Sequence, residues 1–234
     1  MKLFVIAWRN VWRNSRRSSI AIAAMAVALW AELVYSGMIT GLVDDMVAQV
    51  TNVDTGDIQV FGQRWLSRPS LHETVDDRAI LAKLDQSGFP ATARLQAGGL
   101  AASGELSSGV ALVGLDPARD ATVLSVHEQV ADGRWLDPAD DHGVVGSGLA
   151  RSLHLAVGSE LVVLSQGADG SLANDLFTVR GVLSTIGSGT DRSAVLMVEP
   201  TFRALMALPE GAHRIVVRVP PGLDLTDAVG SVAE

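Results

Sequence analysis

Hydrophobic residues form one long continuous run near the start of the chain and many short runs after it. The long run is Ile20–Ile39, twenty residues with no proline and a single charged residue, Glu32. At the rise of an α-helix, twenty residues cover about 30 Å, the thickness of the hydrocarbon core of a bilayer. In lipid, one isolated segment satisfies its own backbone hydrogen bonds only as a helix. The pattern therefore predicts a transmembrane helix, which we place at residues 20–41.

The segments on both sides of this run also show helical periodicity. In residues 1–19 an aromatic stripe and a cationic stripe repeat every four residues, which is typical of a helix lying among lipid headgroups. The residues that we expect at this membrane interface are Phe4, Trp8, Arg9, Trp12, Arg13, Arg16 and Arg17. Residues 42–53 place apolar side chains on one face and acidic ones on the other, which predicts a helical stalk leaving the membrane.

Two features of the apolar run have more than one interpretation. A carboxylate in a spanning helix is costly, so Glu32 is either a pairing or gating group in a helix bundle or a residue close enough to the headgroups to reach water or be protonated. The run itself is alternatively a cleavable signal peptide, with an apolar core at Ile20–Met25 and a cleavage site at 26–28. The apolar run continues beyond that site, which favours the transmembrane interpretation.

Charge is distributed unevenly along the chain. The formal net charge is −8, yet residues 1–17 hold five basic residues and no acidic one. Lysine and arginine remain on the cytoplasmic side of a spanning helix, so we expect a cytoplasmic N-terminus and an acidic domain on the far side of the membrane. An acidic domain lacks the clustered cations that phosphate groups need, which argues against a nucleic-acid partner.

After the stalk, short apolar stretches alternate with turn residues. Strand, helix and then further strands predict an α+β domain. We expect strands at residues 58–61, 110–115, 143–146, 160–164, 177–183, 194–198 and 213–219, and helices beginning near Asp76, Asp116, Ser147, Pro200 and Asp224. Ser147 has the residue type of a helix cap. The last predicted helix runs into the end of the sequence, so we expect the sequence to be part of a longer protein.

Motifs for enzymatic chemistry are missing from the sequence. It has no cysteine, no G-x-S-x-G motif and no H-x-x-x-H zinc motif, and its five histidines are scattered. The loop Asp140-Asp141-His142 has the residue types of metal ligands, but a site needs three or four that converge, and an exposed loop explains it better. We therefore expect no catalytic residue, no metal site and no cofactor on this chain.

The order of several motifs gives the chain a family resemblance. It resembles the permease subunits of ABC transporters of the MacB and LolC–LolE type, the lipoprotein-releasing, FtsX-like group. The residues that carry the resemblance are Ala7–Ser18, Gly56–Phe61, Val113–Asp116, Asp132–Leu136 and Val144–Glu160. Each motif is weak alone, and their order and spacing over the whole chain are more specific.

The resemblance implies an arrangement of domains in a bacterial inner membrane. A periplasmic βαβ-type core module would occupy residues 54–114 and 212–234, with a β-rich inserted subdomain at 115–211 between them, and three further spans would follow. Because the sequence has no G-x-x-x-x-G-K-[ST] motif, we expect ATP and Mg²⁺ on a separate ATPase subunit. A second permease copy or a paralogue, the lipid bilayer, and a lipoprotein cargo or periplasmic protein would be further partners.

The resemblance favours one function, and the sequence leaves another open. The first is a permease subunit that couples ATP hydrolysis to periplasmic movements that release or extrude lipoprotein or a hydrophobic substrate. The alternative is a single-pass, membrane-anchored extracytoplasmic sensor or scaffold.

Overall fold

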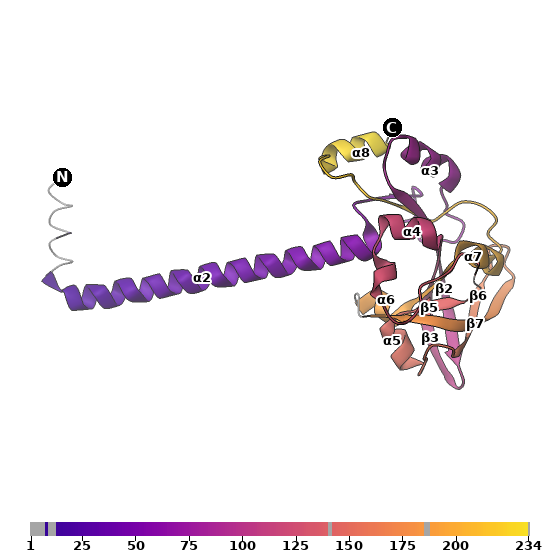
Figure 1. Cartoon of the computed structure of the whole chain (residues 1–234), viewed down its shortest axis with the longest axis horizontal. Coiled ribbons are helices and arrows are strands. Elements are labelled where there is room, and N and C mark those ends of the chain that lie inside the picture. Colours follow the sequence, from indigo (N-terminus) through magenta and orange to yellow (C-terminus); the bar gives the residue numbers. More distant parts are fainter. Residues whose placement is uncertain (1–7, 9–12, 140–141, 185–187, 234) are drawn as a thin grey trace. The chain divides into compact units, whose positions relative to one another are not determined.

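The structure, a computed structural model, describes residues 8, 13–139, 142–184 and 188–233. The chain forms two compact units, residues 1–48 and 49–234, and each is described by itself. Most of the first unit is helix α2 (Ser15–Val50; Figure 1). The last two residues of this helix, Gln49 and Val50, belong to the second unit. The second unit is a mixed α+β domain, as the sequence predicts.

Nine strands among the described residues form one sheet in the second unit. They run in the order β1-β9-β2-β3-β8-β5-β7-β4, and β6 pairs with both β2 and β7. Their bounds are β1 Ile58–Phe61, β2 Ala91–Ser103, β3 Leu106–Leu115, β4 Val130–Gly133, β5 Gly143–Val145, β6 Glu160–Gln166, β7 Leu172–Leu183, β8 Ala194–Val198 and β9 Arg214–Val217. The pairs β3–β8 and β5–β7 are parallel and the other pairs are antiparallel.

Helices and helical turns connect these strands. Their bounds are η1 Thr51–Thr55, α3 Asp77–Gln86, α4 Pro117–Val123, η2 Val126–Gln129, α5 Ser147–Ser152, α6 Ser188–Ser193, α7 Glu199–Met206 and α8 Leu225–Ala233. Local sequence explains several of the starts. The carboxylate of Asp76 accepts a hydrogen bond from the Ala79 amide at the start of α3, and Asp116 caps α4 in the same way.

One end of the domain is a split βαβ motif. Strand β9 lies between β1 and β2 and is antiparallel to both, so β1, α3 and β2 form a βαβ unit with a strand inserted between its two strands. Helices α3 and α8 lie side by side at this end (Figure 1) and share an apolar cluster with the strands. Its buried members are Leu84, Phe89, Ala91, Ile215, Val217 and Ala228.

The rest of the domain is built on a closed ring of strands. Because β6 pairs with β7 and also with β2, the strands β2, β3, β8, β5, β7 and β6 close on themselves. Inward-facing side chains of this ring, with Leu149 of α5 and Phe202 and Met206 of α7, form the largest apolar cluster. Strand β2 belongs to both ends of the domain, because it pairs with β9 at Ala91–Arg94 and with β6 at Leu100–Ala102.

Three details differ from the sequence-based expectations. The run of small residues in β2 gave no strand signal, yet it is part of a strand of thirteen residues. Ser147 does not cap α5; Gly146 occupies that position, because a Cβ there would lie 2.5 Å from the carbonyl oxygen of Asp191. All four residues of β9 are buried instead of alternating, because β9 is enclosed by strands on both edges and by apolar residues on both faces.

The boundary that we predicted at residue 115 falls at the end of β3. The sheet continues across it through the β3–β8 pairing. The division of residues 54–234 into a core module and an inserted subdomain stays a prediction.

Candidate functional site

Helix α2 has the length and composition to cross a membrane. None of its most apolar stretch is buried against other residues of the chain. At the α-helical rise its 36 residues span about 54 Å, more than the hydrocarbon core requires. Leu29 and Leu33 are 66% and 73% exposed, and such an apolar surface is stable next to lipid and unfavourable in water.

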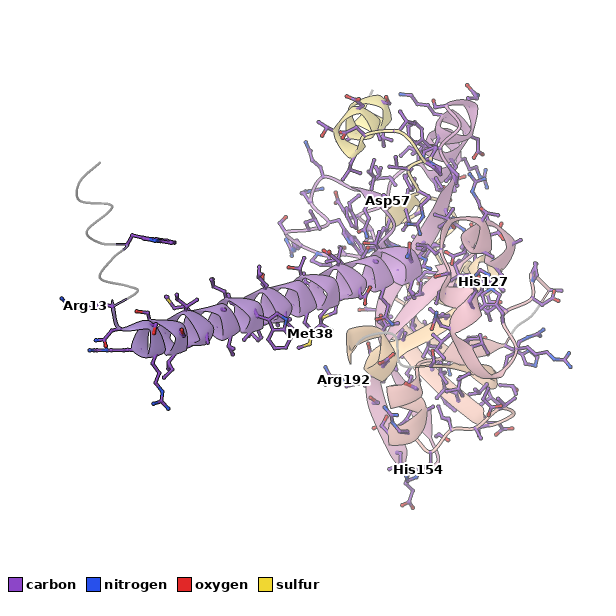
Figure 2. The ribbon with its side chains drawn as sticks, turned by 60° about the vertical axis from the view of Figure 1, so that its left-hand side comes forward. Arg13, Met38, Asp57, His127, His154 and Arg192 are labelled. Carbon is purple, nitrogen blue, oxygen red and sulfur yellow. The ribbon has the colours of Figure 1, made fainter. Side chains whose placement is uncertain are left out.

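Of the predicted interface residues that the structure describes, Arg16 and Arg17 lie in the first turn of α2, and Trp8 and Arg13 precede it. Trp8, Arg13, Arg16 and Arg17 are exposed, and Figure 2 labels Arg13. Phe4, Arg9 and Trp12 lie outside the described residues, as do Asp140 and Asp141 of the loop considered for metal binding. Glu32 lies within α2 and is exposed. Its pairing or gating role, and the membrane-interface role of the aromatic and basic residues, stay predictions.

The end of α2 is joined to the sheet by a short, closely fitted turn. Turn η1 follows α2, and the amide of Gly56 donates to the carbonyl of Thr51 at 2.9 Å. Gly56 has φ +63°, and a Cβ there would lie 2.4 Å from Cγ1 of Val216 on β9. Only glycine combines this backbone conformation with this close approach. The next amide, that of Asp57, already donates to the carbonyl of Val217 at 3.0 Å.

A buried ion network fastens this turn to two strands. Arg94 of β2 is 2% exposed and makes a two-pronged contact with Asp120 of α4, which is fully buried, at 2.8 and 2.9 Å. The remaining Arg94 nitrogen, Nη1, donates to Oδ1 of Asp54 in η1 at 2.7 Å. The same oxygen accepts a hydrogen bond from Nη2 of Arg214 on β9 at 3.0 Å. One carboxylate of the turn thus holds guanidinium groups from both β2 and β9.

The electrostatics of this network favour its charged form. Burial raises the pKa of the Asp54 carboxyl, but the positive charges of Arg214 and Arg94 outweigh it and leave the pKa below the ordinary value. Burial likewise lowers the pKa of Arg94, and the carboxylates of Asp120 and Asp54 reverse this effect and raise it. Both shifts favour the charged forms of Asp54 and Arg94, and each of these two groups lies against an oppositely charged side chain.

A second set of contacts holds the same turn through Arg218 and Val219, the residues that directly follow β9. Arg218 donates to Oδ1 of Asn52 at 3.1 Å and to the carbonyl of Val123 at 3.0 Å. The carboxylate of Asp57, labelled in Figure 2, accepts hydrogen bonds from the Val219 amide at 2.8 Å and from Arg218 at 3.4 Å. Below the turn, Val53 is 3% exposed within an apolar cluster of β3, β5 and β8.

We call residues 51–57 with their partners Arg94, Asp120, Arg214 and Arg218 the junction. Its charged groups are paired with one another, so their role is structural: they hold the turn against the strands. The sequence reasoning found the glycine and the strand that follow the stalk but missed the ion network. One signal was available: Arg94 and Arg214 stand among apolar residues of strands, where a surface charge is out of place.

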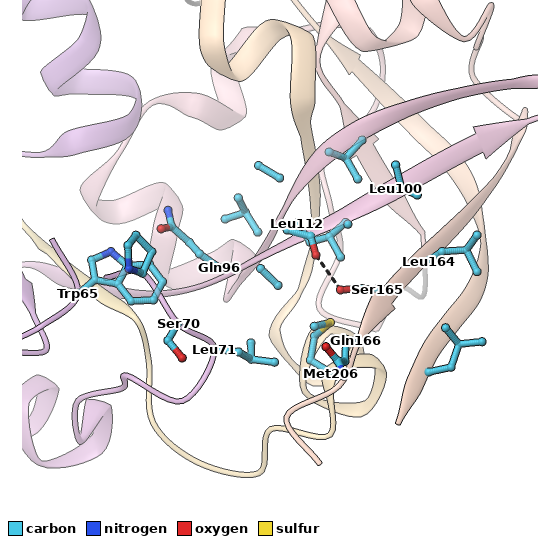
Figure 3. Close-up of a pocket in the computed structure, with 18 residues that line it drawn as sticks. Trp65, Ser70, Leu71, Gln96, Leu100, Leu112, Leu164, Ser165, Gln166 and Met206 are labelled. Atoms are coloured by element: carbon cyan, nitrogen blue, oxygen red, sulfur yellow. Dashed lines mark hydrogen bonds between the residues drawn. The ribbon is translucent and has the colours of Figure 1, made fainter. Parts of the chain in front are cut away.

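A second feature of the domain is an apolar groove of about 970 Å³ beside β2 (Figure 3). A strap, residues 62–75, forms one wall through Trp65, Pro69, Ser70 and Leu71. His213 holds the strap: its Nδ1 accepts the Gln96 amide at 2.9 Å and its Nε2 lies 3.0 Å from the carbonyl of Leu71. The rings of Trp65 and His213 are 4.9 Å apart. Burial lowers the pKa of His213, and the nearby Arg203 adds to this effect while the Leu71 carbonyl opposes it.

A helix long and apolar enough to cross a membrane, followed through a fitted junction by an α+β domain, is the arrangement of a membrane-anchored domain. The family model of the MacB-like periplasmic core domain matches residues 18–234. The chain therefore belongs to the family of MacB-like periplasmic core domains. Domains of this family belong to the permease components of ABC transporters, which act with an ATPase.

Solved structures with the same fold agree. The periplasmic region of MacB from Actinobacillus actinomycetemcomitans is similar at 13% identity and a TM-score of 0.56, over 80% of this chain and 86% of that one. The extracellular domain of the noncanonic ABC-type transporter YknZ from Gram-positive bacteria is similar at 14% identity and a TM-score of 0.52, over 75% and 87%. No curated protein sequence matches the chain. These likenesses confirm the α+β fold that the sequence predicted.

Proposed function

We propose that this chain is a permease subunit that couples ATP hydrolysis on a separate ATPase to movements of its periplasmic domain. ATP and Mg²⁺ are bound by the ATPase subunit. The movements release or extrude a lipoprotein or another hydrophobic substrate, and a second permease copy or a paralogue completes the transporter. In this proposal the N-terminus is cytoplasmic, the membrane is the bacterial inner membrane, and residues after about 42 are periplasmic.

The junction is the observation that carries this proposal. A helix transmits a displacement along its axis, because its backbone hydrogen bonds resist stretching, but only if its end is fixed to the body that it moves. Here the end of α2 continues into residues 51–57, and Asp54 connects these residues to β2 and β9. Those two strands are hydrogen-bonded neighbours within the sheet. A displacement of the helix end is therefore resisted by strand pairing and buried ion pairs rather than by a flexible linker.

The arginines at the start of α2 favour the proposed orientation. Arg13, Arg16 and Arg17 are exposed, and no acidic residue precedes Glu32. Positive charge next to a span remains on the cytoplasmic side. An ATPase subunit works in the cytoplasm, so this end of the helix is the one that would receive its motion.

Isolation of the chain from its native membranes tests this function. We would purify the tagged full-length protein in mild detergent and measure ATP hydrolysis that vanadate inhibits. The expected result is a co-purifying ATPase subunit, together with slower hydrogen exchange at residues 51–57 in one nucleotide state than in the other. A preparation that never contains an ATPase would contradict the proposal and favour a single-pass sensor or scaffold.

A further inference from the structure

The groove beside β2 arises from a gap in strand pairing. Strand β2 pairs with β9 up to Arg94 and with β6 from Leu100 onward, so residues 95–99 lie between the two partners. At Gly99 an added Cβ would lie 2.8 Å from the carbonyl oxygen of Leu164, so glycine lets β6 approach closely. At Gly98 an added Cβ would meet nothing within 4 Å. The Ser165 hydroxyl donates to the Gly98 carbonyl at 2.7 Å, the contact drawn in Figure 3.

The composition of the groove restricts its ligand. Eighteen residues line it, and none of them is Asp, Glu, Lys, Arg or His. Charged residues make up 19% of the chain, so about three would be expected among eighteen by composition alone. Its polar side chains are neutral, and they are Ser70, Gln96, Ser165 and Gln166. Such a lining gives no compensation to a charged ligand, because burying a charge without a partner is costly.

The size and the rim of the groove favour a long apolar ligand. Its volume, about 970 Å³, is at the upper end of the range of roughly 300–1,000 Å³ that is usual for small-molecule sites. Leu112 and Met206 at its base are buried, while Leu100 and Leu172 at its rim are 53% and 76% exposed. Exposed leucines beside an apolar groove extend the surface along which a chain would lie. An open rim leaves a polar head group in water.

We propose that the groove binds the acyl chain of a lipid or of a lipid-modified molecule. The domain begins at Gln49, directly after a helix that is long and apolar enough to cross a membrane. For a protein anchored by such a helix, lipid acyl chains are the most abundant apolar ligands. The acyl chain of the ligand lies between the strap, at Trp65 and Leu71, and the sheet, at Leu100, Leu112 and Leu164. The head group of the ligand stays outside the groove. That this ligand is transported cargo rests on the proposed function, whereas the site itself does not.

Photolabelling tests the site on the full-length protein in lipid nanodiscs. The probe is a lysophospholipid whose palmitoyl chain carries a diazirine, and labelled peptides are identified by mass spectrometry. Labelling of α2 is expected in every sample, because the helix contacts lipid, and it serves as the internal standard. We expect additional label on the peptides that contain Leu100, Leu112 and Leu164.

Two glycine variants make the test specific. Gly98→Phe places a ring in the groove and should reduce the groove label about tenfold relative to the α2 label, a change equivalent to about 1.4 kcal/mol of binding. Gly109→Phe is the matched control: Gly109 lies on the neighbouring strand β3, also has nothing within 4 Å of an added Cβ, and does not line the groove. Circular dichroism of both variants shows whether they are folded.

Each remaining outcome decides against the site. Label confined to α2, or equal groove labelling of Gly98→Phe and wild type, would overturn the proposal. Groove labelling by a diazirine-bearing decanol but not by the lysophospholipid would show that the groove takes a small apolar solute instead of an acyl chain. ATPase co-purification is measured on the same preparations, so a failure of the proposed function is distinguished from a failure of the site.

Discussion

Removal of one buried carboxylate from the junction should destabilise the periplasmic domain severely. In Asp120→Ala, the guanidinium of Arg94, which is 2% exposed in the wild type, loses both contacts to Asp120 and keeps only Asp54 as an ionic partner. Breaking a buried pair from one side costs about 3–5 kcal/mol. The total stability of a domain is only about 5–15 kcal/mol. The substitution would therefore remove a large part of the free energy of unfolding.

Three other variants provide comparisons for the loss of stability expected in Asp120→Ala. Asp54→Ala should cost less, about 1–3 kcal/mol of unfolding free energy. The Asp54 side chain is 36% exposed, so solvent partly screens the charges of Arg94 and Arg214 once their shared carboxylate is removed. Asp85→Ala is the matched control. It breaks a pair with Arg119 whose side chains are 53% and 31% exposed, so the change should stay within about 0.5 kcal/mol. The double variant Arg94→Met, Asp120→Leu removes both charges and should be more stable than Asp120→Ala alone.

Urea titration of the full chain in detergent micelles, followed by circular dichroism in the β-sheet region, measures these differences. The expected order of loss is Asp120→Ala, then Asp54→Ala, then Asp85→Ala. Equal losses for Asp120→Ala and Asp85→Ala would refute the conclusion that Arg94 and Asp120 form a buried, mutually dependent pair. A double variant less stable than Asp120→Ala would refute the assignment of the loss to an unpaired charge.

Two further predictions concern the strap and the turn. His213 has a pKa lowered by burial, so between about pH 6.5 and its lowered folded-state pKa the unfolded chain binds a proton that the folded chain resists, and the free energy of unfolding falls as the pH falls through that range. His213→Asn, which keeps an acceptor for the Gln96 amide and has no group that titrates in this range, should remove that part of the pH dependence in urea titrations; an unchanged slope would contradict the role given to His213. Gly56→Ala should cost about 1–3 kcal/mol, through its φ of +63° and the 2.4 Å approach to Val216, and should speed hydrogen exchange at residues 51–57. Gly88→Ala, at φ +77° with no atom within 4 Å, controls for backbone strain alone, and equal costs for the two would show that the close approach is unimportant.

The features that follow from short-range patterns could be predicted from the sequence. The apolar helix is predicted because lipid selects an uninterrupted run, and strands such as Ile58–Phe61 and Ala194–Val198 are predicted because alternating or continuous apolar residues between turns mark a sheet. The cap of α3 at Asp76 is a local hydrogen bond, so it can also be predicted from the sequence.

The features that depend on long-range pairing could not be predicted. Asp54 meets Arg94 and Arg214 from 40 and 160 residues away. The apolar residues around the two arginines indicate that they are buried, but no local pattern identifies Asp54 as their partner. Strand β2 contains Gly98 and Gly99, which weaken a strand signal, and its pairing on both edges stabilises it. The groove exists because β9 and β6 leave residues 95–99 between them, and that gap is a property of the sheet rather than of any segment.

The central claim is that α2 crosses the bilayer and carries the domain that follows to the other side, and thiol labelling tests it directly. The chain has no cysteine, so Ser15→Cys and Ser107→Cys each give a protein with one thiol, at exposed positions of α2 and β3. With a membrane-impermeant maleimide on intact spheroplasts, we expect Ser107→Cys to be labelled at once and Ser15→Cys only after lysis. Equal labelling of both thiols, or the reverse pattern, would contradict the account.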